Sequence, residues 1–120
     1  MLTTTGAKSG KPRTVPLLAI PEGDNLALIA TNWGQSRYPA WYYNLRAHPR
    51  ATISIQGKSQ NDYVAREATP EEWERLWRKF KDFHAGYAKY KQRIAASSDR
   101  RIPIMVVTPV KDGADATTQD

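Results

Sequence analysis

The short turns between its apolar segments are the feature that most restricts how this chain can fold. The turn at residues 21–25 contains Pro, Gly, Asp and Asn, and another short turn is expected at residues 56–59. Turns of this length cannot cross a sheet to reach a parallel neighbour, so the pattern predicts about six antiparallel strands around a small barrel. The β-prone segments are residues 1–5, 13–20, 26–32, 51–56, 61–67 and 101–108.

A longer helix is predicted to start at residue 69 or 70. Thr69 can cap it, Pro70 suits the first helical position, and Glu72 completes a capping box. The segment 84–86 (HAG) breaks the pattern and is expected to end the helix. Apolar side chains recur at three- and four-residue spacing and predict one buried face: Trp73, Leu76, Trp77, Phe80 and Phe83.

Two shorter helices complete the predicted architecture. Residues 39–47 (PAWYYNLRA) fit a helix with Pro39 in its first turn, and residues 87–94 fit a shorter amphipathic one. The expected fold is therefore mainly β with helices, in the α+β class, and forms a single domain over residues 1–110. Residues 111–120 are small and polar, which predicts a disordered tail.

The charge balance favours an anionic partner. Eighteen Lys and Arg residues oppose twelve Asp and Glu residues, for a net charge of +6. Nucleic acid, a membrane surface and a phosphorylated cofactor all fit this charge. The chain has no cysteine, no long apolar run and no signal-peptide pattern at MLTTTGAKSG, so a cytoplasmic protein without disulfides is expected.

The stretch 6–18 (GAKSGKPRTVPLL) looks like a phosphate-binding loop but does not meet the requirements of one. Its glycines are one residue too close for the Walker pattern, Pro12 replaces the required hydroxyl residue, and a strand follows instead of a helix. No GxGxxG pattern, nucleophile elbow or paired-histidine spacing occurs elsewhere, so nucleotide hydrolysis, a Rossmann site and a metal site are not expected.

The groups that remain are suited to binding. Lys8, Lys11 and Arg13 form a cationic turn that fits a phosphate or a carboxylate, although an ordinary soluble hairpin turn is the alternative. An aromatic stretch at residues 38–43 and a pair of tyrosines at 87 and 90 add flat surfaces. Binding groups without a reactive constellation favour a cofactor that itself carries the chemistry.

Five segments in order resemble the deazaflavin-dependent nitroreductase family, which are split-barrel reductases that use coenzyme F420. They are LTTTGAKSGKPRTVPL, TNWG, PAWYYNLRAHP, GYAKY and RRIPIMVVTP. The resemblance covers nearly the whole chain except its tail. It implies an FMN-binding split-barrel-like fold and a hydride transfer from reduced coenzyme F420 to an electron-poor acceptor such as a quinone, an enone or a nitroaromatic compound.

The same resemblance implies a role for each matching residue. The cationic turn would hold the phosphate and carboxylates of the cofactor, helped by backbone amides, and the following strand would seat its ring. Cofactor contacts are expected from Lys8, Ser9, Gly10, Lys11, Arg13, Pro16, Leu17, Thr31, Asn32, Trp41 and Asn44. Substrate contacts are expected from Leu18, Trp33, Trp41, His84, Tyr87 and Tyr90. The hydroxyls expected to orient or protonate the substrate are those of Thr31, Tyr87 and Tyr90.

Several alternatives remain open from the sequence alone. An FMN-using split barrel and a carrier of a lipid-like ligand share the fold. A basic barrel that binds nucleic acid is less favoured, because six acidic residues are mixed among the ten cations between Arg66 and Arg101. The partner expected is a small-molecule hydride acceptor. A monomer, a homodimer and a peripheral contact with the membrane are all compatible with the sequence.

Overall fold

Seven antiparallel strands form one continuous sheet in the computed structural model, which describes residues 1–55, 61–84, 86–97 and 100–110. The order across the sheet is β2-β1-β5-β6-β7-β4-β3, so β2 and β3 lie at opposite ends although they follow one another in the chain. The strands are β1 (Leu2–Thr5), β2 (Pro12–Val15), β3 (Ile20–Glu22), β4 (Asn25–Ile29), β5 (Arg50–Ile53), β6 (Asn61–Glu67) and β7 (Ile104–Pro109).

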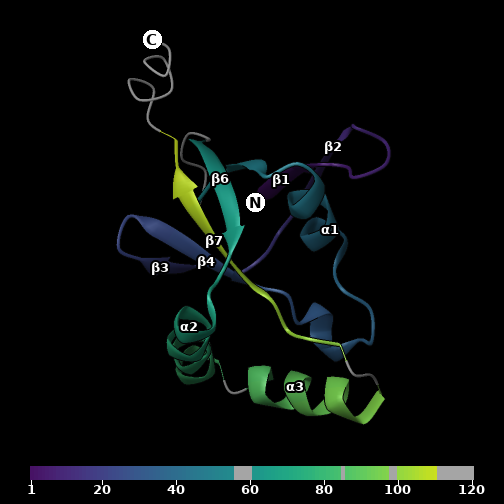
Figure 1. Cartoon of the computed structure of the whole chain (residues 1–120), viewed down its shortest axis with the longest axis vertical. Coiled ribbons are helices and arrows are strands. Elements are labelled where there is room, and N and C mark those ends of the chain that lie inside the picture. The colour runs from purple at the N-terminus through teal and green to yellow at the C-terminus, as the bar shows by residue number, and fades with distance from the viewer. Residues whose placement is uncertain (56–60, 85, 98–99, 111–120) are drawn as a thin grey trace.

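Three α-helices and one short 3-10 helix accompany the sheet. They are η1 (Asn32–Gly34), α1 (Ala40–Ala47), α2 (Pro70–Phe83) and α3 (Gly86–Ser97). Figure 1 shows α2 and α3 together at one end of the molecule, α1 beside β1, and the β1–β2 hairpin projecting away from the sheet. This arrangement leaves the connection between β4 and α1 running between the hairpin and α3.

The sheet buries a different apolar cluster on each face. One contains Leu28, Tyr42, Leu45, Tyr63 and other side chains, and it packs α1 against the inside of the curved sheet. The other joins the remaining strand residues to the aromatic stripe of α2 and to α3. Alternation along β7 explains the division, because successive strand residues point to opposite faces. The predicted α+β class with antiparallel strands is thus confirmed, with seven strands where about six were predicted.

The start of α2 follows the local sequence closely. The Thr69 hydroxyl accepts from the Glu72 amide at 3.3 Å, and the Glu72 carboxylate accepts from the Thr69 amide at 2.9 Å. This is the predicted capping box, with Pro70 at the first helical position. The break before α3 is also confirmed, since α2 ends at Phe83 and α3 begins at Gly86.

Some sequence predictions of secondary structure were wrong. Residues 13–20 are not one strand, because their first part pairs with β1 and only Ile20 onward pairs with β4. Pro16 has no amide to continue the ladder, and residues 16–19 are irregular. Phe83 is 63% exposed because the helix ends there, beyond the last turn that packs on the sheet. Pro39 was predicted in the first turn of α1, but it occupies the N-cap position one residue before the helix begins. The turn at 56–59 and the tail lie outside the described residues.

Candidate functional site

The β1–β2 hairpin ends in a tight cationic loop. The Gly6 amide donates to the Lys11 carbonyl at 2.8 Å, and the Gly10 amide donates back to the Gly6 carbonyl at 3.0 Å. Gly10 has a φ of +70°, which a side chain would disfavour. The Lys11 amide also donates to the Ser9 hydroxyl at 3.2 Å. The loop therefore has a fixed shape, and the amides of Lys8 and Ser9 have no acceptor among the described residues.

Asn44 of α1 anchors this loop from inside the barrel. Its carboxamide oxygen accepts from the Ala7 amide at 2.9 Å, and its nitrogen donates to the Thr4 hydroxyl at 3.0 Å. Asn44 is only 7% exposed. A buried carboxamide needs partners, and these two contacts satisfy it while linking α1 to the strand and to the loop. The predicted cofactor residue Asn44 thus holds the loop in place.

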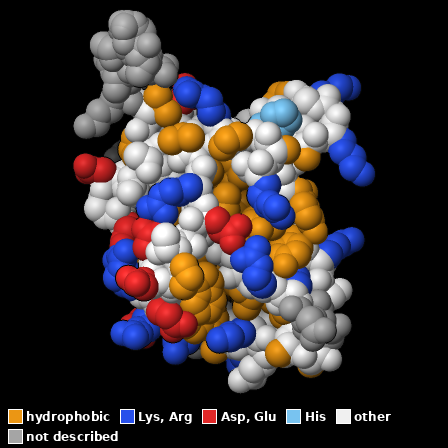
Figure 2. Space-filling view, in the orientation of Figure 1, with side chains coloured by type: hydrophobic (Ala, Val, Ile, Leu, Met, Phe, Trp, Pro, Cys, Tyr) orange, Lys and Arg blue, Asp and Glu red, His pale blue; other side chains and the backbone are white. Residues whose placement is uncertain are grey.

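Acidic groups are few around the loop, although Asp62 of β6 lines a cavity with Thr5 and Pro12 at the base of the hairpin. The only carboxylate side chains within residues 1–61 are Glu22 and Asp24, both at the β3–β4 hairpin. Glu22 pairs there with Lys79 at 2.6 Å and with Arg75. Lys8, Lys11 and Arg13 are exposed and form no ion pair with any described carboxylate. Figure 2 shows blue side chains without red ones over this hairpin, which suits an anionic ligand.

An apolar surface follows the loop along the chain. Val15 and Leu18 are exposed and Pro16 is exposed between them, whereas Leu17 is half-buried. Leu17 and Trp41 both pack against the cluster inside the barrel, so the residues after β2 and the first turn of α1 share one apolar support. Cations at one end and flat apolar groups at the other match a ligand that has a charged tail and a ring.

The Thr31 hydroxyl is buried without a hydrogen-bond partner among the described residues. Thr31 is 5% exposed, and its side chain does not cap the η1 helix that it precedes. The other buried threonine hydroxyl among the described residues, that of Thr4, is satisfied by Asn44. The next residue, Asn32, has a φ of +48°, and its carboxamide donates to the Arg37 carbonyl at 3.1 Å. An unpartnered buried hydroxyl beside strained backbone is typical of a functional site.

A wall of aromatic side chains lies at the junction of α2 and α3. Tyr87 packs edge-on against Phe80 and His84, with ring centres 5.4 and 5.7 Å away, and against Tyr90 at 5.9 Å. The Tyr87 hydroxyl has no hydrogen-bond partner in the described part of the chain, and burial, followed by the neighbouring Tyr90, raises the pKa of Tyr87. Tyr87 therefore stays protonated at neutral pH.

Gly34 brings this wall to the segment that carries Thr31. A Cβ at Gly34 would lie 3.1 Å from the Arg93 Cβ and 3.3 Å from the Tyr90 Cα, and its φ is +84°. Glycine thus allows η1 to pack directly on α3. The structure in this way packs η1, which contains Asn32 and directly follows Thr31, against α3, which carries Tyr87 and Tyr90. The side chain of Trp33 lies outside the described residues.

Arg100 is a residue of this region that our sequence analysis did not single out. Its guanidinium donates to the Ala30 carbonyl at 3.0 Å and to the Thr31 carbonyl at 2.6 Å. These contacts join positions about seventy residues apart in the sequence, which no local pattern reports. The only sequence signal was its place at the start of the RRIPIMVVTP motif.

The charges on α2 and around it do not form a stripe for nucleic acid. Arg66 pairs with Glu72 at 2.7 Å, and Arg101 pairs with Glu67 at 2.7 Å. With Glu22 also holding two cations of α2, much of the positive charge in this half of the chain is neutralised locally. Within the described ranges, no group of three or more metal-binding side chains lies together, and no helix is long and apolar enough to cross a membrane.

Comparison with known proteins identifies the class to which this site belongs. Residues 1–109 match the family model of the F420H2-dependent quinone reductases, and the chain belongs to that family. An F420H2-dependent quinone reductase of Mycobacterium tuberculosis strain H37Rv is 34% identical over 111 residues, which are 90% of this chain and 71% of the relative. The corresponding protein of strain CDC 1551 gives the same values.

Two solved structures are similar to the chain as well. An F420-H2 dependent reductase, FDR-A, is 38% identical, has a TM-score of 0.75, and is matched over 88% of this chain and 90% of its own. A domain-swapped dimer is also 38% identical, with a TM-score of 0.76 over 88% of this chain and 76% of its own. The chain is therefore an F420-dependent reductase with the split-barrel fold.

The residues present fit coenzyme F420, which is the cofactor of this family. The cationic loop lies beside an apolar surface, and Arg100 links the segment of the buried Thr31 hydroxyl to Tyr38, which comes just before α1. Hydride transfer from reduced coenzyme F420 to an electron-poor acceptor, as predicted, is the activity of this class. The alternative cofactor FMN receives no support from the family or from its relatives.

Proposed function

We propose that this chain reduces a quinone and that the residues described above form its active site. The observation that carries this assignment is the Thr31 hydroxyl, which is buried and has no partner among the described residues. Thr31 lies in the connection that packs on α3, where the tyrosine wall stands. A hydroxyl kept from both water and protein partners is available to a bound ligand.

Binding of the cofactor is assigned to the two parts of the hairpin region. Lys8, Lys11 and Arg13 would hold its phosphate and tail carboxylates, and the loop amides of Ser9 and Lys8 would add donors. The half-buried side chains of Leu17 and Trp41, with the exposed Pro16, would support its ring. Gly10 and Asn44 would set the shape of the loop.

The reduction needs a hydride and a proton. When bound, reduced coenzyme F420 supplies the hydride, which carries both electrons and one of the two hydrogens that a quinone gains. The second hydrogen is a proton delivered to a quinone oxygen. Tyr87 is the donor that we assign, because its hydroxyl has no hydrogen-bond partner among the described residues and is protonated at neutral pH. Thr31 and Tyr90 would orient the acceptor, with Leu18, Trp33 and His84 completing the pocket.

The experiment compares the wild type with Thr31→Val and Thr31→Ser. Oxidation of reduced coenzyme F420 is followed by absorbance with menadione as the acceptor, and coenzyme F420 and FMN are titrated in parallel by tryptophan quenching. Thr31→Val is expected to lower kcat by about ten- to a hundredfold, while Thr31→Ser retains most activity because it keeps the hydroxyl. Equal rates for Thr31→Val and the wild type would overturn the assignment of Thr31.

A homodimer and a membrane contact stay predictions of the same proposal. The sheet ends in two unpaired edges, β2 and β3, and all four residues of β2 are exposed. One solved relative is a domain-swapped dimer, so we infer that two copies of this chain can also form a homodimer. Light scattering after size exclusion tests the dimer, and sedimentation with anionic vesicles tests the membrane contact.

A further inference from the structure

Arg100 lies where the strand β4 leaves the sheet and the chain turns toward η1. The last ladder contact of this strand is the Ala30 amide, which donates to the Pro103 carbonyl at 2.9 Å. Beyond this point the backbone carbonyls of Ala30 and Thr31 are still in the interior, since Ala30 is fully buried and Thr31 nearly so. Buried carbonyls without a donor are costly, so this turn needs donors from outside the sheet.

The guanidinium of Arg100 supplies those donors. Nη1 donates to the Ala30 carbonyl at 3.0 Å, Nη2 to the Thr31 carbonyl at 2.6 Å, and Nε to the Gln35 carbonyl at 3.1 Å. One planar group thus binds carbonyls on both sides of η1. The Thr31 carbonyl also accepts from the Gly34 amide at 2.9 Å, so the guanidinium reinforces the first turn of η1.

Tyr38 fixes the position of the guanidinium itself. The Arg100 Cζ lies 4.9 Å from the centre of the Tyr38 ring, and the Arg101 amide donates to the Tyr38 hydroxyl at 3.2 Å. A planar guanidinium can stack on a ring and donate in several directions at once, whereas a lysine ammonium is a single point of charge. The arrangement therefore depends on arginine and not only on a positive charge.

We propose that Arg100 is a positioning residue that fixes the backbone at Thr31 and so aims the Thr31 hydroxyl at the bound cofactor and acceptor. The inference rests on the proposed function, because it assigns Thr31 a role in the reaction. It adds a residue that lies in a distant segment of the chain and that would affect the reaction through the backbone of Thr31. Arg100 has other contacts as well, and none of the argument requires it to be free of them.

A double-mutant cycle between Arg100→Lys and Thr31→Val tests the coupling. If Arg100 acts through the Thr31 hydroxyl, Arg100→Lys lowers kcat about tenfold in the wild-type background and less than about twofold when Thr31 is already valine. If Arg100→Lys only disturbed the structure in general, it would lower kcat by the same factor in both backgrounds. Arg101→Lys is the matched control, because Arg101 binds Glu67 and Tyr42 instead of the Thr31 segment, and its effect should be additive with Thr31→Val.

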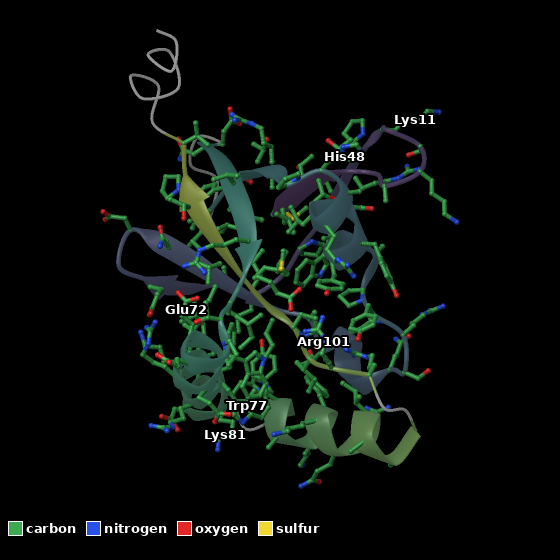
Figure 3. The ribbon with its side chains drawn as sticks, viewed as in Figure 1. Lys11, His48, Glu72, Trp77, Lys81 and Arg101 are labelled. Carbon is green, nitrogen blue, oxygen red and sulfur yellow. The ribbon has the colours of Figure 1, made fainter. Side chains whose placement is uncertain are left out.

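Amide exchange gives a second readout that needs neither cofactor nor acceptor. Arg100→Lys is expected to speed exchange of the Gly34 and Gln35 amides about tenfold, while the Val106 and Val107 amides in β7 keep the wild-type rates. Arg101→Lys should leave all four unchanged. Figure 3 shows Arg101 near the middle of the molecule, at the end of the segment that precedes β7.

The two readouts separate the possible failures. Two results would overturn the role of Arg100 and leave the proposed function standing. One is an unchanged amide-exchange rate at Gly34 and Gln35 in Arg100→Lys. The other is an active wild type in which the losses of kcat from Arg100→Lys and Thr31→Val are additive. A wild type that cannot pass a hydride to menadione or another quinone would overturn the proposed function. The amide-exchange rates of Gly34 and Gln35 would then decide by themselves whether Arg100 fixes the segment around η1.

Discussion

The carboxamide of Asn44 donates to the Thr4 hydroxyl over 3.0 Å inside a barrel whose other described contents are almost entirely apolar. Both side chains are buried, and each satisfies the other. Because Asn44 also binds the Ala7 amide, the interior of the barrel is connected directly to the cationic loop. Loop position and core packing therefore depend on one side chain of α1.

Replacing Asn44 with leucine should affect stability and binding together. The change leaves the Thr4 hydroxyl and the Ala7 amide without their partner, which should lower the free energy of unfolding by about 1–3 kcal/mol. The loosened loop should also bind coenzyme F420 more weakly. Urea unfolding and tryptophan quenching measure the two effects. Thr52→Val, which removes an exposed contact with Asp62, is the control and should change stability by less than about 0.5 kcal/mol.

Removing the cations of the hairpin loop should weaken cofactor binding without weakening the fold. Lys8→Ala combined with Arg13→Ala should raise the Kd for coenzyme F420 by about a hundredfold at low salt, and by less at high salt because screening already reduces the attraction. Lys81→Ala is the control, since Lys81 lies on α2, far from Lys11 in Figure 3. If Lys81→Ala weakened the binding of coenzyme F420 equally, the net charge of the protein and not the hairpin loop would determine the affinity.

Gly34→Ala should separate η1 from α3. The new methyl group would press on Arg93 and Tyr90 and would occupy a left-handed conformation, so a loss of about 2 kcal/mol in stability is expected together with a lower kcat. Gly23→Ala is a matched variant, because Gly23 also has a positive φ, of +62°, but nothing lies within 4 Å of its Cβ position. The free energy of unfolding of Gly23→Ala should fall by only about 1 kcal/mol, and this variant should keep its activity.

The capping box of α2 should make stability depend on acid. Arg66, followed by the Thr69 amide, lowers the pKa of Glu72 from 4.5 to about 2. A lowered pKa stabilises the fold above the unfolded value, and this contribution disappears as the pH falls through about 2. Glu72→Gln should therefore cost about 1 kcal/mol at pH 7 after allowance for solvent screening, and the difference from the wild type should shrink between pH 4.5 and 2. If the difference in the free energy of unfolding between Glu72→Gln and the wild type stayed constant from pH 4.5 to 2, this prediction would be wrong.

Elements fixed by local interactions were predictable from the sequence. The bounds of β6 and the start of α2 follow from alternation and from a capping box, which involve only neighbouring residues. The division of residues 13–20 was not predictable, because it depends on which partner strand lies on each side. Alternation cannot tell one long strand from two short ones that pair with different neighbours.

The residues of the candidate site also divide into those that a local sequence pattern predicts and those that only the folded sheet brings into contact. Lys8, Lys11 and Arg13 are grouped in the sequence, so their placement on one loop follows from a single hairpin. Arg100 binds carbonyls about seventy positions earlier, and that contact exists only after the sheet has formed. The partnerless state of the Thr31 hydroxyl is equally invisible in the sequence, since it depends on the burial of Thr31 and on the absence of any neighbouring donor or acceptor among the described residues.

The place of β7 within the sheet determines when this protein can fold. β7 pairs with β6 on one side and with β4 on the other, yet it follows every other strand in the chain. During synthesis, β4 and β6 therefore emerge from the ribosome with no strand between them, and their facing edges stay open until residue 109 is free. We therefore expect ribosome-stalled fragments that stop before Ile104 to aggregate, because the edges of β4 and β6 that β7 covers are then unpaired.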